Sequence, residues 1–479
     1  IWDFADQTFK IKDNNGRAIW GYGRDMGNVG ATSDTSFCAD GLFAADHTPH
    51  PQAFELKKVY QYIHFQPVDF SAGLIKITNR YDFTNLNQFD FFWTVKADGK
   101  VVAKGKLDPV DLQPGTSGNY KIDIPSFDIQ PRTEYFLDIE ADLRSAQPLL
   151  PAGYCVAAEQ FQLPYYKTAQ PARNTNFNAL KMNETNESAS FSSDNFNISF
   201  SKKDGWLHGY QLNGMELMQQ ALQPHFWRAA TDNDIGNSQQ MRCAVWENVL
   251  DNAHLDSFVT EQQSPQQWRI TTQHYFPDVD AKYRVVYIIN TDGDVQVSAK
   301  MIAGDKYHPE LPRFGMRMIL NKDYDKVTWL GRGPFDNYSD RKYAARVDVY
   351  AMPADSLFHP YARAQESGYR TDVRWIGLTN RTGVGLMAIG QSLISSGVLH
   401  FNMNRLEFDR YAAQNNHGGS MSNEDLIWWN IDYGQSGVAG DNAWGARPHA
   451  EYQLPYKDYE YTFTLRPVGE NDVMTNKAK

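Results

Sequence analysis

Residues 285–301 read VVYIINTDGDVQVSAKM, and this stretch decides the class of fold. The run Val285-Val286-Tyr287-Ile288 is rich in β-branched and aromatic residues, which favour strands. Asp292-Gly293 is a hairpin signal, because glycine accepts the positive φ that such a turn requires. On the return, apolar residues take every second position from Val295 to Met301, as one face of a strand does. The stretch therefore predicts a β-hairpin.

The β pattern continues to the end of the chain. Apolar residues alternate again at Tyr459, Tyr461, Phe463 and Leu465, as a closing strand would require. No repeat has the period of about 40–50 residues that propeller blades give. We therefore predict a very large β-sandwich over residues 176–470, followed by a tail at 471–479.

A smaller β region precedes this sandwich. The run Phe91-Phe92-Trp93-Thr94-Val95 is typical of a strand, and Asp98-Gly99 is a second hairpin signal. Short strands at regular spacing over about a hundred residues fit an immunoglobulin-like sandwich, which we place at residues 64–165. The polar stretch from Asn174 to Asn195 is interpreted as a linker or an exposed connection.

The first sixty residues differ from the rest. Residues 1–4 have the pattern of a short strand end, an irregular glycine-rich stretch follows at 21–27, and Pro51 opens a helix. One such β/α unit cannot bury its own strand. We therefore expect residues 1–63 to belong to a larger α/β body, and the chain to be a fragment of a longer protein.

Composition argues against several classes of partner. The 479 residues include 46 Lys and Arg against 57 Asp and Glu, a net charge of −11, which repels nucleic acid. No stretch approaches the roughly 20 apolar residues of a membrane span. The three cysteines lie far apart, with no spacing typical of a disulfide framework or a metal site. We expect neither nucleic-acid nor membrane partners, and the compartment stays open between bacterial cytoplasm and periplasm.

Several polar loops could carry function. Residues 226–237 combine aromatics, an arginine and two carboxylates, which fits either a ligand-facing loop or metal site, or a turn held by buried hydrogen bonds. The charges of Arg332, Asp340 and Arg341 lead us to expect an internal network of ion pairs that holds this loop. Trp444 lies in a small polar loop, where we expect it to be partly exposed and able to stack on the C–H face of a sugar.

Taken together, these segments resemble the large bacterial β-galactosidases of glycoside hydrolase family 2. The motifs follow the family's order from end to end, at residues 1–7 (IWDFADQ), 37–42, 46–51, 227–236, 329–341, 366–370 and 440–444. The resemblance covers essentially the whole chain and corresponds to the C-terminal half of such an enzyme. It implies a mainly β fold: the remnant of a (β/α)₈ barrel, an immunoglobulin-like β-sandwich, and a large sandwich of the galactose mutarotase-like supersandwich type.

The resemblance also implies which parts are elsewhere. These enzymes are retaining glycosidases with two glutamates about 5–5.5 Å apart. In the family both glutamates lie on barrel strands that precede the segment corresponding to residue 1. The Mg²⁺ ligands and an N-terminal sugar-binding domain also precede that segment. We therefore assign no catalytic residue to this chain and expect it to be inactive alone.

A few site residues are carried over by the resemblance. Trp2 resembles the tryptophan that packs against the galactose ring, and Trp444 the one that serves the aglycone subsite. The backbone carbonyl of Phe37 resembles a ligand of a Na⁺ ion, and Asp40 stands where many members have an asparagine ligand. Gly236 resembles the hinge of a mobile loop near the active site, which glycine's free dihedrals suit.

Two functions stay open at this point. The first is the C-terminal portion of a β-galactosidase that hydrolyses terminal β-D-galactosides, with the N-terminal half of the enzyme as partner and, as is common in the family, a homo-oligomeric assembly. The second is a stand-alone carbohydrate-binding or assembly module without catalysis. A chain that begins inside a barrel strand favours the first, because an orphan β/α unit would expose its apolar face.

Overall fold

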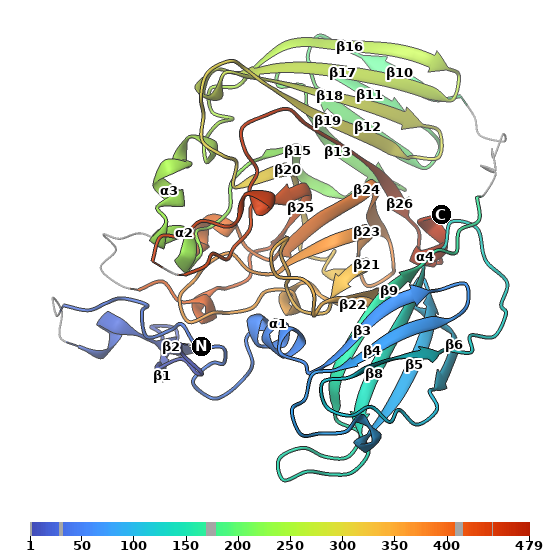
Figure 1. Ribbon diagram of the computed structural model, residues 1–479. Coiled ribbons are helices and arrows are strands. Elements are labelled where there is room, and N and C mark those ends of the chain that lie inside the picture. The colour runs from blue at the N-terminus through green and yellow to red at the C-terminus, as the bar shows by residue number, and fades with distance from the viewer. Residues whose placement is uncertain (1, 28–31, 169–178, 408–414, 443) are drawn as a thin grey trace. The chain divides into compact units, whose positions relative to one another are not determined.

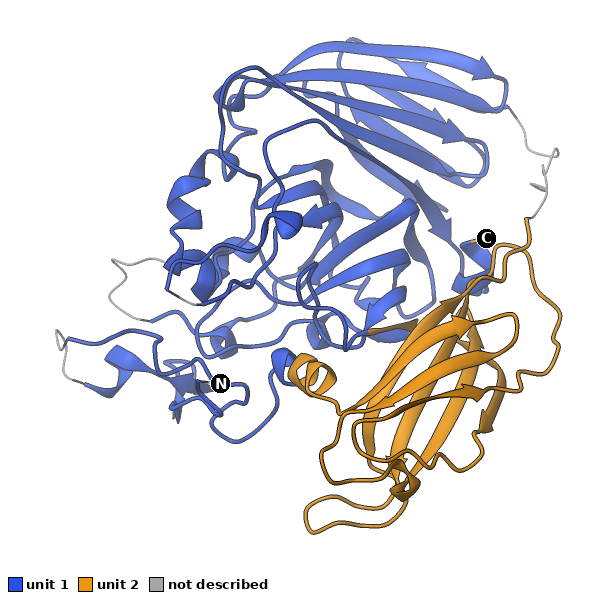
Figure 2. Ribbon diagram, in the orientation of Figure 1, with its two compact units in different colours: residues 1–53, 174–345, 350–478 blue, residues 54–173, 346–349, 479 orange. Residues whose placement is uncertain are grey.

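The computed structural model describes residues 2–27, 32–168, 179–407, 415–442 and 444–479 (Figure 1). Strands dominate, and the helices are short, so the expected mainly β class is confirmed. The chain divides into two compact units (Figure 2): residues 1–53, 174–345 and 350–478 form unit 1, and residues 54–173, 346–349 and 479 form unit 2. None of the described helices combines the length and apolarity needed to cross a bilayer.

Unit 2 contains two antiparallel sheets around one core. One sheet has the order β3 (Ile63–Asp69), β4 (Leu74–Asn79), β7 (Ser117–Lys121), and the other β6 (Lys100–Lys106), β5 (Phe89–Ala97), β8 (Tyr135–Leu143), β9 (Cys155–Leu163). The predicted Asp98-Gly99 turn joins β5 to β6, and both of its residues have positive φ. Val95 and Ile139 are fully buried between the sheets. Two sheets with this arrangement form an immunoglobulin-like sandwich.

A 17-stranded antiparallel sheet system builds most of unit 1. Its strands are β10 (Lys181–Glu184), β11 (Ser188–Ser192), β12 (Phe196–Ser201), β13 (Leu207–Leu212), β14 (Met215–Glu216), β15 (Met218–His225), β16 (His254–Ser264), β17 (Gln267–Phe276), β18 (Ala281–Asn290), β19 (Val295–Ala303), β20 (Arg313–Asn321), β21 (Lys326–Gly333), β22 (Arg346–Pro353), β23 (Tyr369–Thr379), β24 (Gly385–Leu399), β25 (Leu426–Gln435) and β26 (Tyr459–Val468). The helices of the chain are α1 (Pro51–Val59), α2 (Asp232–Gly236), α3 (Gln239–Arg242) and α4 (Met474–Lys477).

The hairpin that the sequence predicts is formed by β18 and β19. Val285 pairs with Ala299 and Tyr287 with Val297, and β26 then pairs with the other edge of β19, where Val297 lies opposite Phe463. Burial alternates residue by residue along these strands. The alternating apolar residues therefore face the core, as their period of two requires.

Strand β24 connects several parts of the same sheet system. Strand β23 pairs with β24 between Gly385 and Gly397, and β24 also pairs with β26 over its first residues, from Gly385, and with β25 over its last, from Ser395. Two register shifts interrupt its pairing with β23. Such bulges bend a strand, which allows one strand to serve more than one neighbour.

The N-terminal segment differs from the prediction. Residues 2–4 are not a strand, and Ala5 makes a single parallel bridge with Phe43. The backbone of residues 3–7 does find partners along residues 38–43, with the N–H of Gln7 donating to the carbonyl of Cys38 at 2.7 Å, but only Ala5 and Phe43 have the regular pairing of a β-bridge. A short hairpin, β1 (Phe9–Lys12) and β2 (Ala18–Gly21), precedes the irregular stretch and was not predicted. The helix at Pro51 is present as α1, most of which belongs to unit 2.

The predicted domain limits, at 63/64, 165 and 176–470, stay predictions.

Candidate functional site

A cavity of about 940 Å³ lies within unit 1. Its walls include residues from 2–6, 34–41, 50–52, 231–236, 338–341, 361–366 and 438–444. The site residues taken from the resemblance all line it: Trp2, Phe37, Asp40, Gly236 and Trp444. Residues that are far apart in the sequence therefore meet at one cavity, although their roles there stay predictions.

Exposed aromatic rings form part of the cavity wall. Trp2 is 76% exposed and Trp444 80%, and Phe37 is about half exposed. The rings of Phe37 and Trp444 lie 5.6 Å apart between centroids, at 51°. The backbone N–H of Trp444 donates to the side chain of Asn442 at 2.8 Å. Flat apolar faces with polar groups beside them suit a sugar, whose rings have an apolar C–H face.

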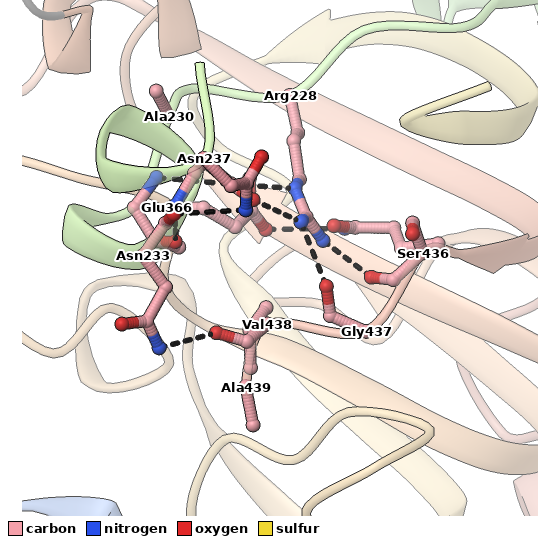
Figure 3. Close-up of polar contacts among 12 residues, drawn as sticks. Arg228, Ala230, Asn233, Asn237, Glu366, Ser436, Gly437, Val438 and Ala439 are labelled. Atoms are coloured by element: carbon pink, nitrogen blue, oxygen red, sulfur yellow. Dashed lines mark hydrogen bonds and ion pairs between the residues drawn. The ribbon is translucent and has the colours of Figure 1, made fainter. Parts of the chain in front are cut away.

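A buried ion pair fixes the turn at α2 (Figure 3). Both Nε and Nη2 of Arg228 donate to the carboxylate of Asp234, at 3.1 and 2.8 Å, and the guanidinium also donates to the carbonyls of Ser436 and Gly437. Thr231 caps α2 by accepting from the backbone N–H of Asp234. The structure thus shows the buttressed turn that was one of the two interpretations of residues 226–237.

The same turn also faces the cavity. Asp232, Asn233, Ile235 and Gly236 line it, and Asn233 donates to the carbonyl of Val438 at 3.0 Å (Figure 3). The structural and the ligand-facing interpretations of this segment are therefore compatible, because Arg228 and Asp234 hold the turn while other residues of the same turn line the cavity.

Two carboxylates hold the loop that carries Phe37 and Asp40. Ser36 donates its hydroxyl hydrogen to Asp232 at 2.8 Å, and the backbone N–H of Gly41 donates to Asp6 at 2.8 Å. A Cβ at residue 41 would lie 2.2 Å from the backbone nitrogen of Asp6, so the close approach requires glycine. We call residues 34–41 the anchored loop.

Asp6 is itself part of a buried polar chain. Its second carboxylate oxygen lies 2.9 Å from Nε2 of His50, and Nδ1 of His50 lies 2.7 Å from Nε2 of His359. Burial lowers the pKa of His359 to about 4, against an opposing effect of Asp336, so this ring is neutral at pH 7. The donor in the hydrogen bond between His50 and His359 depends on which ring nitrogens carry hydrogens. These hydrogen-bonded side chains, Asp6, His50 and His359, join the N-terminal segment to the large β region.

The carbonyl of Phe37 and the carboxylate of Asp40 suit a hard cation. Both are oxygen donors, the kind that such cations prefer. Burial raises the pKa of Asp40, and the nearby carboxylates of Asp3, Asp6 and Asp232 raise it further. A cation at this place would offset that negative charge. Among the described residues, no group of three or more His, Cys, Asp or Glu side chains is arranged to hold a metal ion, so further ligands would have to be carbonyls, water, ligand oxygens or groups outside the described part.

Glu366 is the one glutamate among the described cavity-lining residues. It is buried, burial raises its pKa, and Gln435 donates to it at 3.1 Å while Arg313 lies 3.6 Å away. A retaining glycosidase needs two carboxyl groups on opposite sides of the scissile bond. The described part of this cavity offers no second glutamate to pair with Glu366, and the other carboxylates that line it belong to Asp6, Asp34, Asp40 and Asp232.

The predicted ion-pair network is present in part. Arg332 pairs with Asp372 at 2.5 Å, and Arg341 pairs with Asp336 at 2.7 Å. Asp340 instead accepts from the backbone N–H of Ala439 at 2.8 Å.

Sequence reasoning missed Asp6 and His50 as cavity residues, whereas Asp232 lies in the segment 226–237 that it offered as a ligand-facing loop. Asp6 and His50 lie inside the motifs at 1–7 and 46–51, which was the one available signal.

Comparisons with known proteins agree along the chain. Residues 192–465 match the family model described as "Beta galactosidase small chain", residues 75–164 match "Beta-galactosidase, domain 4", and residues 1–65 match "Glycosyl hydrolases family 2, TIM barrel domain". A β-galactosidase of Priestia megaterium is 32% identical over 470 residues, which cover 98% of this chain and 44% of that protein. A β-galactosidase of Vibrio cholerae is 31% identical over 480 residues, which cover 97% of this chain and 44% of that protein.

The chain spans about 44% of the length of these relatives. Among solved structures, a galactose 1-epimerase from Lactobacillus acidophilus is similar with a TM-score of 0.38 and 9% identity, over 61% of this chain and all of that one.

Proposed function

The chain belongs to the family of β-galactosidase small chains, and from this premise we propose that it forms the C-terminal part of a retaining β-galactosidase acting on terminal β-D-galactosides. The observation that carries the proposal is the cavity of unit 1. Trp2, Phe37, Asp40 and Trp444 line this cavity together, although they come from opposite ends of the sequence.

Each of these residues has a proposed task. Trp2 offers its exposed ring to the galactose, and Trp444 offers its ring to the group on the other side of the glycosidic bond. The carbonyl of Phe37 and the carboxylate of Asp40 would hold Na⁺, which when bound supplies a positive charge for a sugar hydroxyl. These contacts orient the substrate, and orientation alone lowers a reaction barrier substantially.

The catalytic carboxylates are proposed to come from polypeptide that precedes the matched region in the longer relatives, as are the ligands of Mg²⁺. Glu366 lacks a second glutamate beside it in the described part of the cavity. Without an acid/base and a nucleophile, the chain positions a galactoside but does not cleave it.

A replacement experiment tests this proposal. The matched region of the Priestia megaterium β-galactosidase is replaced by this chain, and turnover of a chromogenic β-galactoside is compared between the chimera, the chain alone and the chimera with Trp444→Ala. We expect turnover by the chimera, none by the chain alone, and weaker binding of aglycone-extended ligands in the Trp444→Ala variant. Turnover by a contaminant-free sample of the chain alone would contradict the placement of the catalytic groups.

The second candidate, a carbohydrate-binding module without catalysis, is favoured by the exposure of Trp2 and Trp444 on a single cavity. Calorimetric titration of the chain with galactose and lactose addresses it. Binding by the chain together with an inactive but folded chimera would favour this alternative.

A further inference from the structure

We propose that Asp232 is a positioning residue, which fixes the anchored loop (residues 34–41) and thereby sets the places of Phe37 and Asp40 in the cavity. The inference rests on the proposed function in one respect, since the consequence for ligands assumes that these two residues bind Na⁺ and sugar. The consequence for the loop itself does not depend on that assumption.

The carboxylate of Asp232 joins three separate segments of unit 1. Oδ1 accepts from the hydroxyl of Ser36 at 2.8 Å and from Nε of Arg363 at 2.7 Å. Oδ2 accepts from the side chain of Gln365 at 3.0 Å, and the backbone N–H of Asp232 donates back to Gln365 at 3.3 Å. The anchored loop, the first residue of α2 and the stretch 361–366 therefore meet at one side chain.

Asp232 is itself held firmly by Arg363 and by the helix in which it lies. Arg363 is buried, and its Nη2 also donates to the carbonyl of Ala230 at 3.2 Å. Asp232 begins α2, which the buried pair of Arg228 and Asp234 holds in place. The position of Asp232 is therefore fixed by α2 and Arg363. Its carboxylate can in turn restrain Ser36.

The restraint acts directly on the proposed binding residues. Ser36 precedes Phe37, so a displacement of Ser36 moves the Phe37 carbonyl and the ring that contacts Trp444. Asp6 holds the other end of the loop at Gly41. With both ends held, Phe37 and Asp40 are presented in one arrangement, and such preorganisation strengthens binding because less conformational freedom is lost.

Variants of the full chain test the inference through loop mobility. We compare Ser36→Ala and Asp232→Asn with Ser71→Ala, a control in unit 2 that removes an exposed hydroxyl donating to the carboxylate of Asp69 at 2.6 Å and should leave exchange in residues 34–41 unchanged. Amide hydrogen exchange in residues 34–41 should become about three- to tenfold faster in the first two variants, the range expected for a lost hydrogen bond to a charged group that is partly exposed. Exchange in β18 and β19 should not change, and Ser36→Thr, which keeps the hydroxyl, should restore the wild-type rate.

Binding measurements on the same variants provide the second readout. The NaCl concentration that gives half of the Na⁺-specific thermal stabilisation, with KCl as reference, should rise about three- to tenfold in Ser36→Ala and Asp232→Asn. Because the two residues form one contact, the double variant should be no worse than the worse single variant. Unchanged loop exchange, or additive effects on it, would overturn the inference. If loop exchange rises while the wild type responds to neither Na⁺ nor galactose, the positioning role stands and the proposed function fails.

Discussion

Within unit 1, residues 2–53 and the large β region are held together in different ways. In the β region, apolar side chains such as Val297 and Phe463 are completely buried in alternation along each strand. In residues 2–53, Phe9 is 63% exposed, and the links to the β region include polar ones, as between His50 and His359, beside ring contacts such as that of Phe37 with Trp444. Burial of apolar area gives most of a fold's stability, whereas hydrogen bonds add little net free energy but fix geometry. The comparison indicates that the large β region supplies most of the stability of unit 1, whereas the polar contacts of residues 2–53 fix the positions of cavity residues.

The largest test of this comparison is Phe463→Ala against Phe9→Ala. Phe463 is fully buried, so its loss should lower the free energy of unfolding of unit 1 by about 3–5 kcal/mol through lost burial and a cavity. Phe9→Ala should cost under about 0.5 kcal/mol, as for most exposed positions. Urea unfolding of both variants measures this. Similar losses would mean that residues 2–53 contribute a core of their own.

The second test concerns the ion pair beneath the cavity. Asp234→Asn leaves the buried Arg228 without its anionic partner and should cost about 3 kcal/mol. The control is Asp425→Asn, which removes an exposed partner of Lys322 and should cost less than about 1 kcal/mol. Urea midpoints at constant slope measure both. Equal losses in the free energy of unfolding for the two variants would contradict the proposal that the buried Arg228–Asp234 pair stabilises the turn more than an exposed pair does.

The third test uses pH. Burial raises the pKa of Glu407, which accepts from Nε1 of Trp227 at 2.7 Å, to about 7. A carboxyl with a higher pKa in the folded than in the unfolded state binds protons more readily when folded, so its contribution is full below pH 4 and is lost as pH rises to 7. Relative to wild type, Glu407→Gln should therefore gain roughly 2–3 kcal/mol between pH 4 and pH 8.

The control for this test lies in residues 2–53. Hydrogen bonds from Thr48 lower the pKa of Asp46, so its contribution has the opposite sign and is lost as pH falls. Asp46→Asn should lack the gain with rising pH. A Glu407→Gln curve parallel to that of wild type would refute the assigned burial effect.

The smallest test concerns the polar link itself. His50→Asn breaks the chain from Asp6 to His359 and should increase hydrogen exchange in residues 2–53 about tenfold, which corresponds to about 1–2 kcal/mol of local opening. His47→Asn changes an exposed histidine of the same loop and should leave exchange unaffected. Faster exchange throughout β18 and β19 in the His50 variant would point to a global rather than a local effect.

Local patterns predicted some of the β elements and missed others. The stretch 174–195, interpreted as a linker or an exposed connection, contains β10 and β11, and the hairpin of β1 and β2 was not predicted. The hairpin at 285–301 and the alternation at 459–465 depend on neighbouring residues, and the structure has both. The exposure of Trp444 was also predicted, because its loop has too few apolar neighbours to bury an indole.

Contacts across the chain could not be predicted in the same way. His50 and His359 are 309 positions apart, and Ser36 and Asp232 are 196 apart, with no local pattern that links them. The strand end expected at residues 1–4 is not found at the described residues 2–4, for a related reason. A strand depends on its neighbours, and although Asp3 and Phe4 bond to residues 40–43, regular pairing is limited to Ala5 and Phe43. The family motifs indicated residues that line the cavity, whose roles stay predictions, and the side chains that hold them were visible only in the structure.

The pairing of β26 has a consequence for how the protein is made. Residues 459–468 supply the partner for β19 and for the first part of β24, so both strands keep an open edge until the ribosome has synthesised nearly all of this chain. Open edges of this kind invite pairing with other nascent chains, and closure over such long sequence separations is slow. The late position of β26 in the sequence therefore leaves these edges open during synthesis, and the risk of aggregation is greatest before residues 459–468 have been made.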